Sequence, residues 1–176
     1  HNGFLHARWP AMWHKRVGSE VFAQVQFNEF KLLQLRALGG AGVRVAAVLS
    51  KYVELYVGSG YMFEYENLDL DDLGLHPMAG LAGPRHPDKT YHHRWTNYLS
   101  LRVDVTKWVH ITNVLYAQPR FDDFKDVRIL EDFSVNFKVF KRFAVVLAFI
   151  LDWDSRPPLE VEPLDTKLIV KLKFSF

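Results

Sequence analysis

Two adjacent histidines, His92 and His93, precede Arg94 and follow a stretch that contains His76 and His86. Histidine is a common ligand of transition metals, so these residues are the strongest candidates for a metal site. Neighbouring side chains of an extended strand point to opposite faces, however, so His92 and His93 cannot both enter one site. We therefore expect no metal and no cofactor, and interpret these histidines as loop-edge residues that contact lipopolysaccharide or solvent.

Ser100 and His110 are the pair closest to hydrolase machinery, because both fall on the same face of neighbouring predicted strands. Neither lies in a nucleophile motif, and the chain has no G-x-S-x-G sequence. It also contains no cysteine, which excludes thiolate nucleophiles, disulfides and zinc–thiolate sites. The sequence predicts no enzymatic activity; a barrel-embedded lipid or ester hydrolase is the third alternative.

Charged residues of both signs recur on one face of the predicted strands, where they would line a narrow lumen. They are Arg44, Glu54, Glu64, Arg94, Arg102, Asp104, Arg128, Asp132, Lys138, Asp152, Lys171 and Lys173. Buried charges must pair to offset their desolvation, so we interpret them as a salt-bridged network that plugs the lumen. A narrow selective channel is the alternative, although the mixed signs indicate no ion preference.

These side chains need strands to position them, and period-two alternation recurs from end to end of the chain. It is clearest at residues 167–176, where apolar positions alternate with Lys167, Lys171, Lys173 and Ser175. A C-terminal strand that ends in an aromatic residue is typical of bacterial outer-membrane barrels. We predict about nine strands, at residues 4–14, 20–31, 34–49, 52–67, 91–106, 108–121, 126–140, 143–154 and 166–176.

The predicted connections alternate between short and long. The links at 50–51, 106–107 and 141–142 are tight, whereas those at 67–89, 120–125 and 155–165 are longer and carry most of the prolines. Short periplasmic turns and long outer loops are typical of outer-membrane barrels. If the last of nine antiparallel strands ends in the periplasm, the first strand begins on the outer side of the membrane. Because single-chain bacterial barrels have even strand numbers, we expect at least one further N-terminal strand and a whole barrel of about 10–12 strands.

Composition bounds the remaining possibilities. The 176 residues are 49% hydrophobic and fit one domain spanning 1–176, and the balance of 22 basic and 20 acidic residues excludes a strongly basic nucleic-acid surface. The longest uncharged apolar run, 143–151, is far short of the roughly 20 residues of a spanning helix, but a barrel strand needs only about 9–11. Aromatic residues at the predicted strand ends indicate girdles at the membrane interfaces. They are Trp95, Trp108, Phe143, Trp153, Phe174 and Phe176.

Several motifs resemble a bacterial family described as salt-induced outer-membrane proteins, a domain family of unknown function. The resemblance rests on Arg94-Trp95-Thr96-Asn97-Tyr98-Leu99, on Gln118-Pro119 with Asp126-Val127-Arg128, and on Trp153-Asp154-Ser155-Arg156-Pro157-Pro158. Asp165-Thr166 before the aromatic-terminated strand, the glycines at 39, 40 and 42, and the segment 58–64 extend it. The resemblance implies an outer-membrane barrel and brings no catalytic residues.

The sequence thus predicts an all-β, antiparallel transmembrane barrel in the outer membrane of a Gram-negative-type bacterium, with a structural, envelope or scaffold role. The expected partners are outer-membrane lipid and lipopolysaccharide, and no nucleic acid. Asn113 and Glu131 depart from this pattern, since both fall on the lipid-facing parity. A bulge, a strand that extends beyond the bilayer, or contact with another envelope protein at that face would each explain them. A soluble ligand-binding barrel, with apolar residues inside and charges outside, is the non-membrane alternative.

Overall fold

The computed structural model describes residues 2–28, 33–68, 89–140, 142–157 and 162–174. These residues form nine strands and no helix. The strands are β1 (Asn2–Met12), β2 (Val17–Asn28), β3 (Leu33–Leu49), β4 (Val53–Leu68), β5 (Lys89–Asp104), β6 (Val109–Pro119), β7 (Val127–Phe140), β8 (Phe143–Asp154) and β9 (Leu164–Phe174). The predicted strands are confirmed, with boundaries displaced by a few residues, and no described element is a helix able to cross a membrane.

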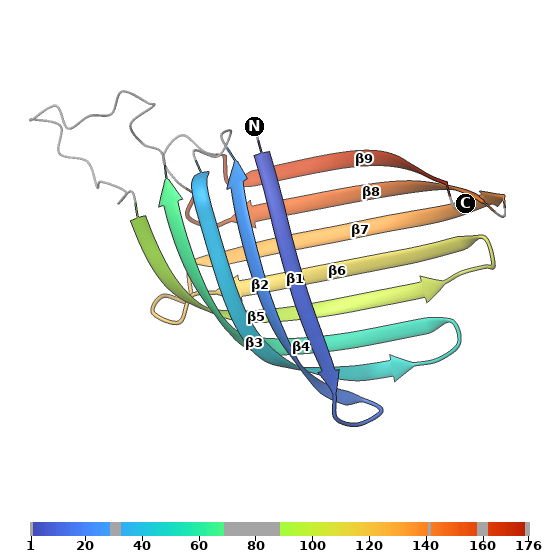
Figure 1. Cartoon of the computed structure of the whole chain (residues 1–176), viewed down its shortest axis with the longest axis horizontal. Helices are drawn as coiled ribbons and strands as arrows, with labels where there is room; N and C mark the ends of the chain where they lie inside the picture. Colours follow the sequence, from blue (N-terminus) through green and yellow to red (C-terminus); the bar gives the residue numbers. More distant parts are fainter. Residues whose placement is uncertain (1, 29–32, 69–88, 141, 158–161, 175–176) are drawn as a thin grey trace, which may run out of the picture.

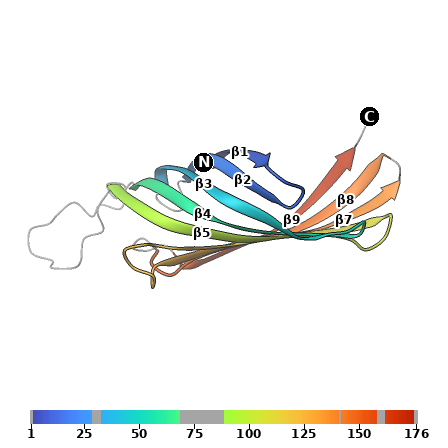
Figure 2. The same cartoon turned by 90° about the horizontal axis from the view of Figure 1, so that it is seen from below.

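The strands form one antiparallel meander in sequence order, from β1 to β9. Figure 1 shows the sheet curling, so that β1 and β2 cross in front of β6 to β9. Seen from below in Figure 2, the sheet is a trough with one concave and one convex face. Within the described residues β1 and β9 are its edge strands, so the observed architecture is a curled half-barrel.

The register assigns every strand residue to a face, because residues directly opposite one another on paired strands lie on the same side of a sheet. Met62 of β4, for example, lies between Gly40 of β3 and Arg94 of β5. Even-numbered residues from β1 to β8 occupy the concave face along most of their length. In β9 the odd-numbered residues occupy it, since Ala144 of β8 lies opposite Lys173.

The two faces have the opposite character from those of a water-soluble β-sandwich. The concave face buries Glu20, Glu64, Glu66, Arg94 and Arg128. The convex face exposes large apolar side chains along most strands, including Val21, Val43, Val57, Leu99, Leu147, Leu168 and Val170. Leu168 is 77% exposed, whereas Arg94 is 1% exposed. The alternation in the sequence therefore places charge inside the curve and apolar side chains outside it.

Two of the short links between strands use the same hydroxyl-based turn. In the β3–β4 link, Ser50 Oγ accepts hydrogen bonds from the backbone N–H groups of Val53 at 2.9 Å and Tyr52 at 3.3 Å. In the β5–β6 link, Thr106 Oγ1 accepts from the N–H groups of Val109 at 3.0 Å and Trp108 at 3.1 Å. Side-chain oxygens thus satisfy backbone donors that the strand ladders leave free.

Glycines allow aromatic rings to lie against the backbone on the concave face. A Cβ atom at Gly58 would overlap the ring of Tyr98, and one at Gly40 would overlap the ring of Phe22. Both rings come from neighbouring strands, so the glycines let side chains cover the backbone of β3 and β4.

Candidate functional site

Charged side chains from several strands meet at the end of the sheet where the longer links attach. We call this group the arginine–carboxylate cluster; its members are Arg36, Arg94, Arg120, Arg128, Glu64, Glu66, Asp122, Asp126 and Asp154. They come from β3, β4, β5, β7, β8 and the link between β6 and β7. Strands that are distant in the sheet contribute to it because the curl brings their concave faces together.

Glu64 is the central carboxylate of the arginine–carboxylate cluster. Arg94 Nε donates to its Oε2 at 2.8 Å, Arg36 Nε lies 3.1 Å from its Oε1, and Arg128 Nη1 contacts Oε1 as well. The side chain of Glu64 is almost completely buried. Three guanidinium groups therefore replace the water that an ionised carboxylate would otherwise need.

Arg128 links that centre to the next carboxylates. Its Nη2 donates to Glu66 Oε2 at 3.0 Å and its Nε donates to Asp154 Oδ2 at 2.6 Å. Arg128, the second residue of β7, lies directly opposite Asp154, the last residue of β8, so the pairing register sets this contact. Each of the three guanidinium nitrogens thus contacts a different carboxylate, two of them on β4 and one on β8.

The β6–β7 link contributes Arg120, Asp122 and Asp126 to the arginine–carboxylate cluster. Asp126 accepts from Arg94 Nη1 at 3.1 Å and from Arg120 Nη1 at 2.9 Å. Arg120 also holds Asp122 through two nitrogens, and this hydrogen bonding lowers the pKa of Asp122 to about 2 and raises the pKa of Arg120. The ion pair between Asp126 and Arg94 therefore fixes the link to the sheet, and Arg120 connects Asp126 to Asp122 within the link.

A second polar group, centred on Arg8, spans the concave space. Arg8 Nη2 of β1 donates to the Tyr116 hydroxyl of β6 at 2.7 Å, and its guanidinium lies 5.3 Å from the ring centroid of Tyr98. Tyr98 in turn donates to Glu20 Oε2 at 2.9 Å. Contact between β1 and β6 requires both side chains to point inside the curve, which identifies this face as the concave one.

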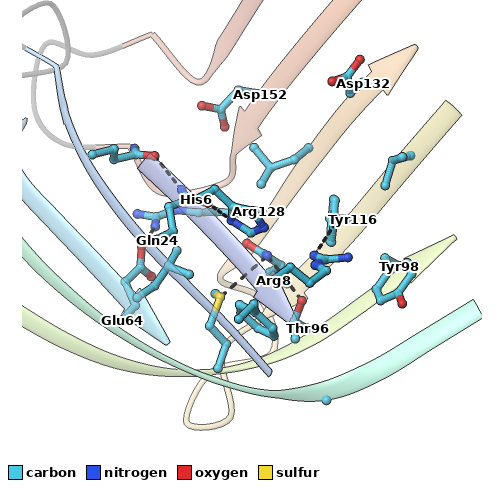
Figure 3. Close-up of a pocket in the computed structure, with 18 of the residues that line it drawn as sticks. His6, Arg8, Gln24, Glu64, Thr96, Tyr98, Tyr116, Arg128, Asp132 and Asp152 are labelled. Carbon is cyan, nitrogen blue, oxygen red and sulfur yellow. Dashed lines mark hydrogen bonds and ion pairs between the residues drawn. The ribbon is translucent and has the colours of Figure 1, made fainter. Parts of the chain in front are cut away.

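A cavity of about 400 Å³ lies between Arg8 and the arginine–carboxylate cluster. Figure 3 shows Arg8, Glu64 and Arg128 projecting into the same space, with Asp132 and Asp152 on its far side. Its lining mixes aromatic rings, amides and charges, among them Phe22, Gln24, Gln26, Tyr98, Tyr116 and Gln118. The concave space is thus hollow in its middle and closed by paired charges toward the longer links.

The structure brings only some of the sequence-predicted lumen charges together. Glu64, Arg94 and Arg128 meet in the arginine–carboxylate cluster. Arg102 pairs with Asp104 at 3.4 Å on the same face near the short turns. Arg44 instead stacks over the ring of Tyr56, with 4.2 Å between its guanidinium carbon and the ring centroid.

The other predicted lumen charges occupy the concave face without joining that cluster. Asp132 and Asp152 line the cavity. Glu54, Lys138, Lys171 and Lys173 share the concave register, and within the described residues they form no ion pair. The charge network is therefore concentrated at one end of the trough and sparse toward the other.

Sequence reasoning missed several members of the network. Arg8, Glu20, Arg36 and Glu66 have the inward parity, so a complete reading of the alternation would have found them. Arg36 and Glu66 are also directly opposite each other, but the register counted from the β3–β4 turn to this pair crosses a β-bulge at Ala46/Val48. Asp126 falls at the start of the predicted strand 126–140, whereas in the structure it lies in the link before β7.

The residues considered for catalysis or metal binding do not assemble. Ser100 and His110 both lie on the concave face, where His110 Nδ1 bonds to Asp104 Oδ1 at 2.6 Å and its Nε2 has no partner among the described side chains. His92 and His93 lie on opposite faces, as expected, whereas His76 and His86 fall outside the described residues. Within the described ranges no group of three or more histidine or carboxylate side chains could hold a metal ion.

Four of the predicted girdle residues lie toward the two ends of the convex face: Trp95 and Trp153 near the longer links, and Phe143 and Phe174 near the short turns, where their rings are 5.0 Å apart. Trp108 lies in the short β5–β6 link. Phe176 is outside the described residues. The richest aromatic group was not predicted: on β4 and β5, Tyr61, Phe63, Tyr65, Tyr91 and His93 form a continuous row of ring contacts.

Comparison with known families gives one match. The profile of the family described as "Protein of unknown function, DUF481" matches residues 1–176, the whole chain. No curated protein and no solved structure matches significantly.

Proposed function

Because this chain belongs to the DUF481 family of proteins of unknown function, we propose a function from its geometry: a non-enzymatic β-barrel of the bacterial outer membrane with a plugged lumen. The barrel would serve a structural, envelope or scaffold role, in contact with outer-membrane lipid and lipopolysaccharide. The likeness of its motifs to salt-induced outer-membrane proteins belongs to this proposal.

The observation that carries the proposal is the inversion of polarity between the two faces. A sheet in water buries its apolar face, yet here the convex face exposes Val57, Leu99 and Val170 while the concave face buries Glu64 and Arg94. Lipid-facing apolar side chains and an interior of polar ones are what a membrane barrel requires. The row of aromatic rings near the longer links fits an interfacial girdle.

The plug is supported by the arginine–carboxylate cluster. Its charges pair with one another from strands on different sides of the trough, and Asp126 brings the β6–β7 link over them. Because its members include both signs in close contact, the cluster leaves little net field to attract one kind of ion.

Migration in gels tests the membrane barrel. The purified chain should need detergent to remain soluble, and after folding in detergent it should migrate differently with and without boiling. A chain that stays soluble and monomeric without detergent, with no heat-dependent shift, would contradict the proposal and favour a soluble barrel.

A narrow channel is the second candidate, and the cavity of about 400 Å³ is the observation that favours it. Conductance across a planar lipid bilayer separates the two. The plugged barrel should show no steady conductance, and Arg128→Leu, which removes a central cation of the cluster, should raise the frequency of openings. Steady conductance of the unmodified protein would establish the channel instead.

The hydrolase alternative is tested by assaying lipid and ester hydrolysis. We expect no activity above that of empty detergent micelles. Hydrolysis that disappears in both Ser100→Ala and His110→Ala would contradict the non-enzymatic proposal.

A further inference from the structure

Asn113 and Glu131 form a polar pair in the middle of the apolar convex face. Asn113 Nδ2 donates to Glu131 Oε1 at 2.8 Å, from β6 to β7. Asn113 lies directly opposite Phe133, and Glu131 lies opposite both Leu115 and Leu151. The neighbouring residue Thr112 bonds to Ser134 on the concave face, so Asn113 points outward. The two residues that departed from the sequence pattern are therefore partners.

The Asn113–Glu131 pair does not use all of its hydrogen-bonding groups. Within the described residues the bond between them is the one hydrogen bond that either side chain makes. A carboxylate has two acceptor oxygens and an amide has two N–H donors and an acceptor oxygen, so capacity remains on both. Both side chains are only partly buried, which leaves that capacity accessible on the convex surface.

A second set of polar residues on the convex face can be compared with the Asn113–Glu131 pair. Ser59 Oγ donates to Asn97 Oδ1 at 2.8 Å and accepts from Trp95 Nε1 at 2.8 Å. Asn97 Nδ2 also donates to the Trp95 backbone carbonyl at 3.4 Å. That set satisfies its polar atoms locally, and the Asn113–Glu131 pair does not.

The incomplete hydrogen bonding of Asn113 and Glu131 matters because of the proposed membrane location. Asn113 and Glu131 are several residues from the ends of β6 and β7, so in the proposed barrel they face the hydrocarbon. Polar groups there are costly when unpaired, and carboxylates in membrane segments almost always face protein or water.

We propose that the convex face around Asn113 and Glu131 is the contact surface for a second copy of this chain, related by a two-fold axis. This inference rests on the proposed outer-membrane location. The pair is self-complementary, since it places a free amide donor beside a free carboxylate acceptor. A two-fold contact requires the same patch on both copies, so Asn113 of each would donate to Glu131 of the other. Leu115 and Phe133 would pack around this polar centre.

Disulfide trapping tests the contact, because the chain has no cysteine of its own. Leu115→Cys places a thiol beside Glu131, and Val21→Cys places one on the convex face of β2 as a matched control. Both native side chains are exposed, at 39% and 54%. In lipid vesicles at low protein density, oxidation should convert Leu115→Cys mainly to a covalent dimer and leave Val21→Cys mainly monomeric.

The polar pair itself is tested by adding Asn113→Leu and Glu131→Leu to Leu115→Cys. This apolar pair suits a lipid-facing surface, so the barrel should still fold and show its heat-dependent migration, while the covalent dimer should be lost. The proposal would be overturned if the wild-type barrel were heat-modifiable but monomeric and if Leu115→Cys and Val21→Cys formed covalent dimers equally. That result would leave lipid or another protein at that face. Unchanged dimerisation in the leucine variant would also overturn it. Absence of heat-modifiable migration in every variant would instead contradict the membrane barrel.

Discussion

At the scale of single residues, Arg128 shows how the concave face tolerates charge. Its guanidinium group contacts Glu64, Glu66 and Asp154, so one side chain pairs with three carboxylates. Removing one partner of a buried ion pair is much more costly than replacing the whole pair, because the remaining charges keep their desolvation. Arg128 is therefore where the structure is most sensitive to loss of charge.

We expect Arg128→Leu to lower the free energy of unfolding by about 3–5 kcal/mol. Urea unfolding in detergent micelles, followed by tryptophan fluorescence, measures this change. Arg102→Leu is the matched control: it also removes an arginine from an ion pair on the concave face, but its side chain is 53% exposed. Exposed pairs contribute about 1 kcal/mol or less. Equal losses in the two variants would contradict a buried network centred on Arg128.

Gly58 gives a second prediction at this scale. Gly58→Ala would drive a methyl group into the Tyr98 ring and disturb its hydrogen bond to Glu20, so we expect a loss of about 1–3 kcal/mol in unfolding free energy. Gly39→Ala is the control, since the nearest atom to a Cβ there is at 3.8 Å, an ordinary contact. It should be neutral or stabilise slightly. Destabilisation of the same size in both variants would exclude ring packing as the cause.

The candidate site was only partly predictable at this scale. Parity alone placed Glu64, Arg94 and Arg128 on one face, because alternation is a property of the strand backbone. It did not distinguish them from Lys171 and Lys173, which share the face without joining the cluster. That distinction depends on the register and on the curl of the sheet. Together they bring Arg36 of β3 and Asp154 of β8 into one network through Glu64 and Arg128. The contacts of Asp126 with Arg94 and Arg120 depend on the conformation of the β6–β7 link, which alternation does not determine.

At the scale of elements, the short turns show how local sequence ends a strand and starts the next. Ser50 and Thr106 occupy equivalent places before β4 and β6, and each hydroxyl accepts from the backbone N–H groups that follow. The hydroxyl group thereby sets the geometry of a tight link.

Ser50→Ala should therefore lower the unfolding free energy by about 0.5–1.5 kcal/mol, the contribution of a typical lost hydrogen bond. Ser50→Thr should restore most of it, because Thr106 already fulfils this role in the β5–β6 link. Urea unfolding of the two variants provides the comparison. If threonine were as destabilising as alanine, the hydroxyl group would not explain the turn.

Elements were the most predictable level of the structure. Alternation located β9, whose convex half is apolar and whose concave half is mostly polar, whereas β8 was located within the uncharged apolar run at 143–151. Boundaries were less accurate: β2 begins at Val17 rather than residue 20, and β9 begins at Leu164 rather than residue 166. In both, the ladder continues into residues whose polarity carries no alternation, such as Gly18 and Asp165.

At the scale of the whole molecule, the account depends on which solvent covers the convex face. In water that face would expose an apolar surface over almost every strand, far beyond what a soluble monomer tolerates. In a membrane the same surface is favourable, and the buried charges face one another across the trough instead of facing lipid. The fold class and the polarity inversion follow from the alternation in the sequence. Closure and insertion into a membrane are part of the proposed function.

The most direct measurement of that claim uses two adjacent residues of β9. Val170 lies on the convex face and Lys171 on the concave face, opposite Leu147 and Val146 respectively. A fluorophore attached to Val170→Cys or Lys171→Cys in lipid vesicles can be challenged with brominated lipid and with aqueous iodide. The account predicts that brominated lipid quenches the probe at 170 strongly and the probe at 171 weakly, with the reverse order for iodide. Strong quenching of the probe at 170 by iodide, with none by brominated lipid, would contradict a lipid-facing convex surface.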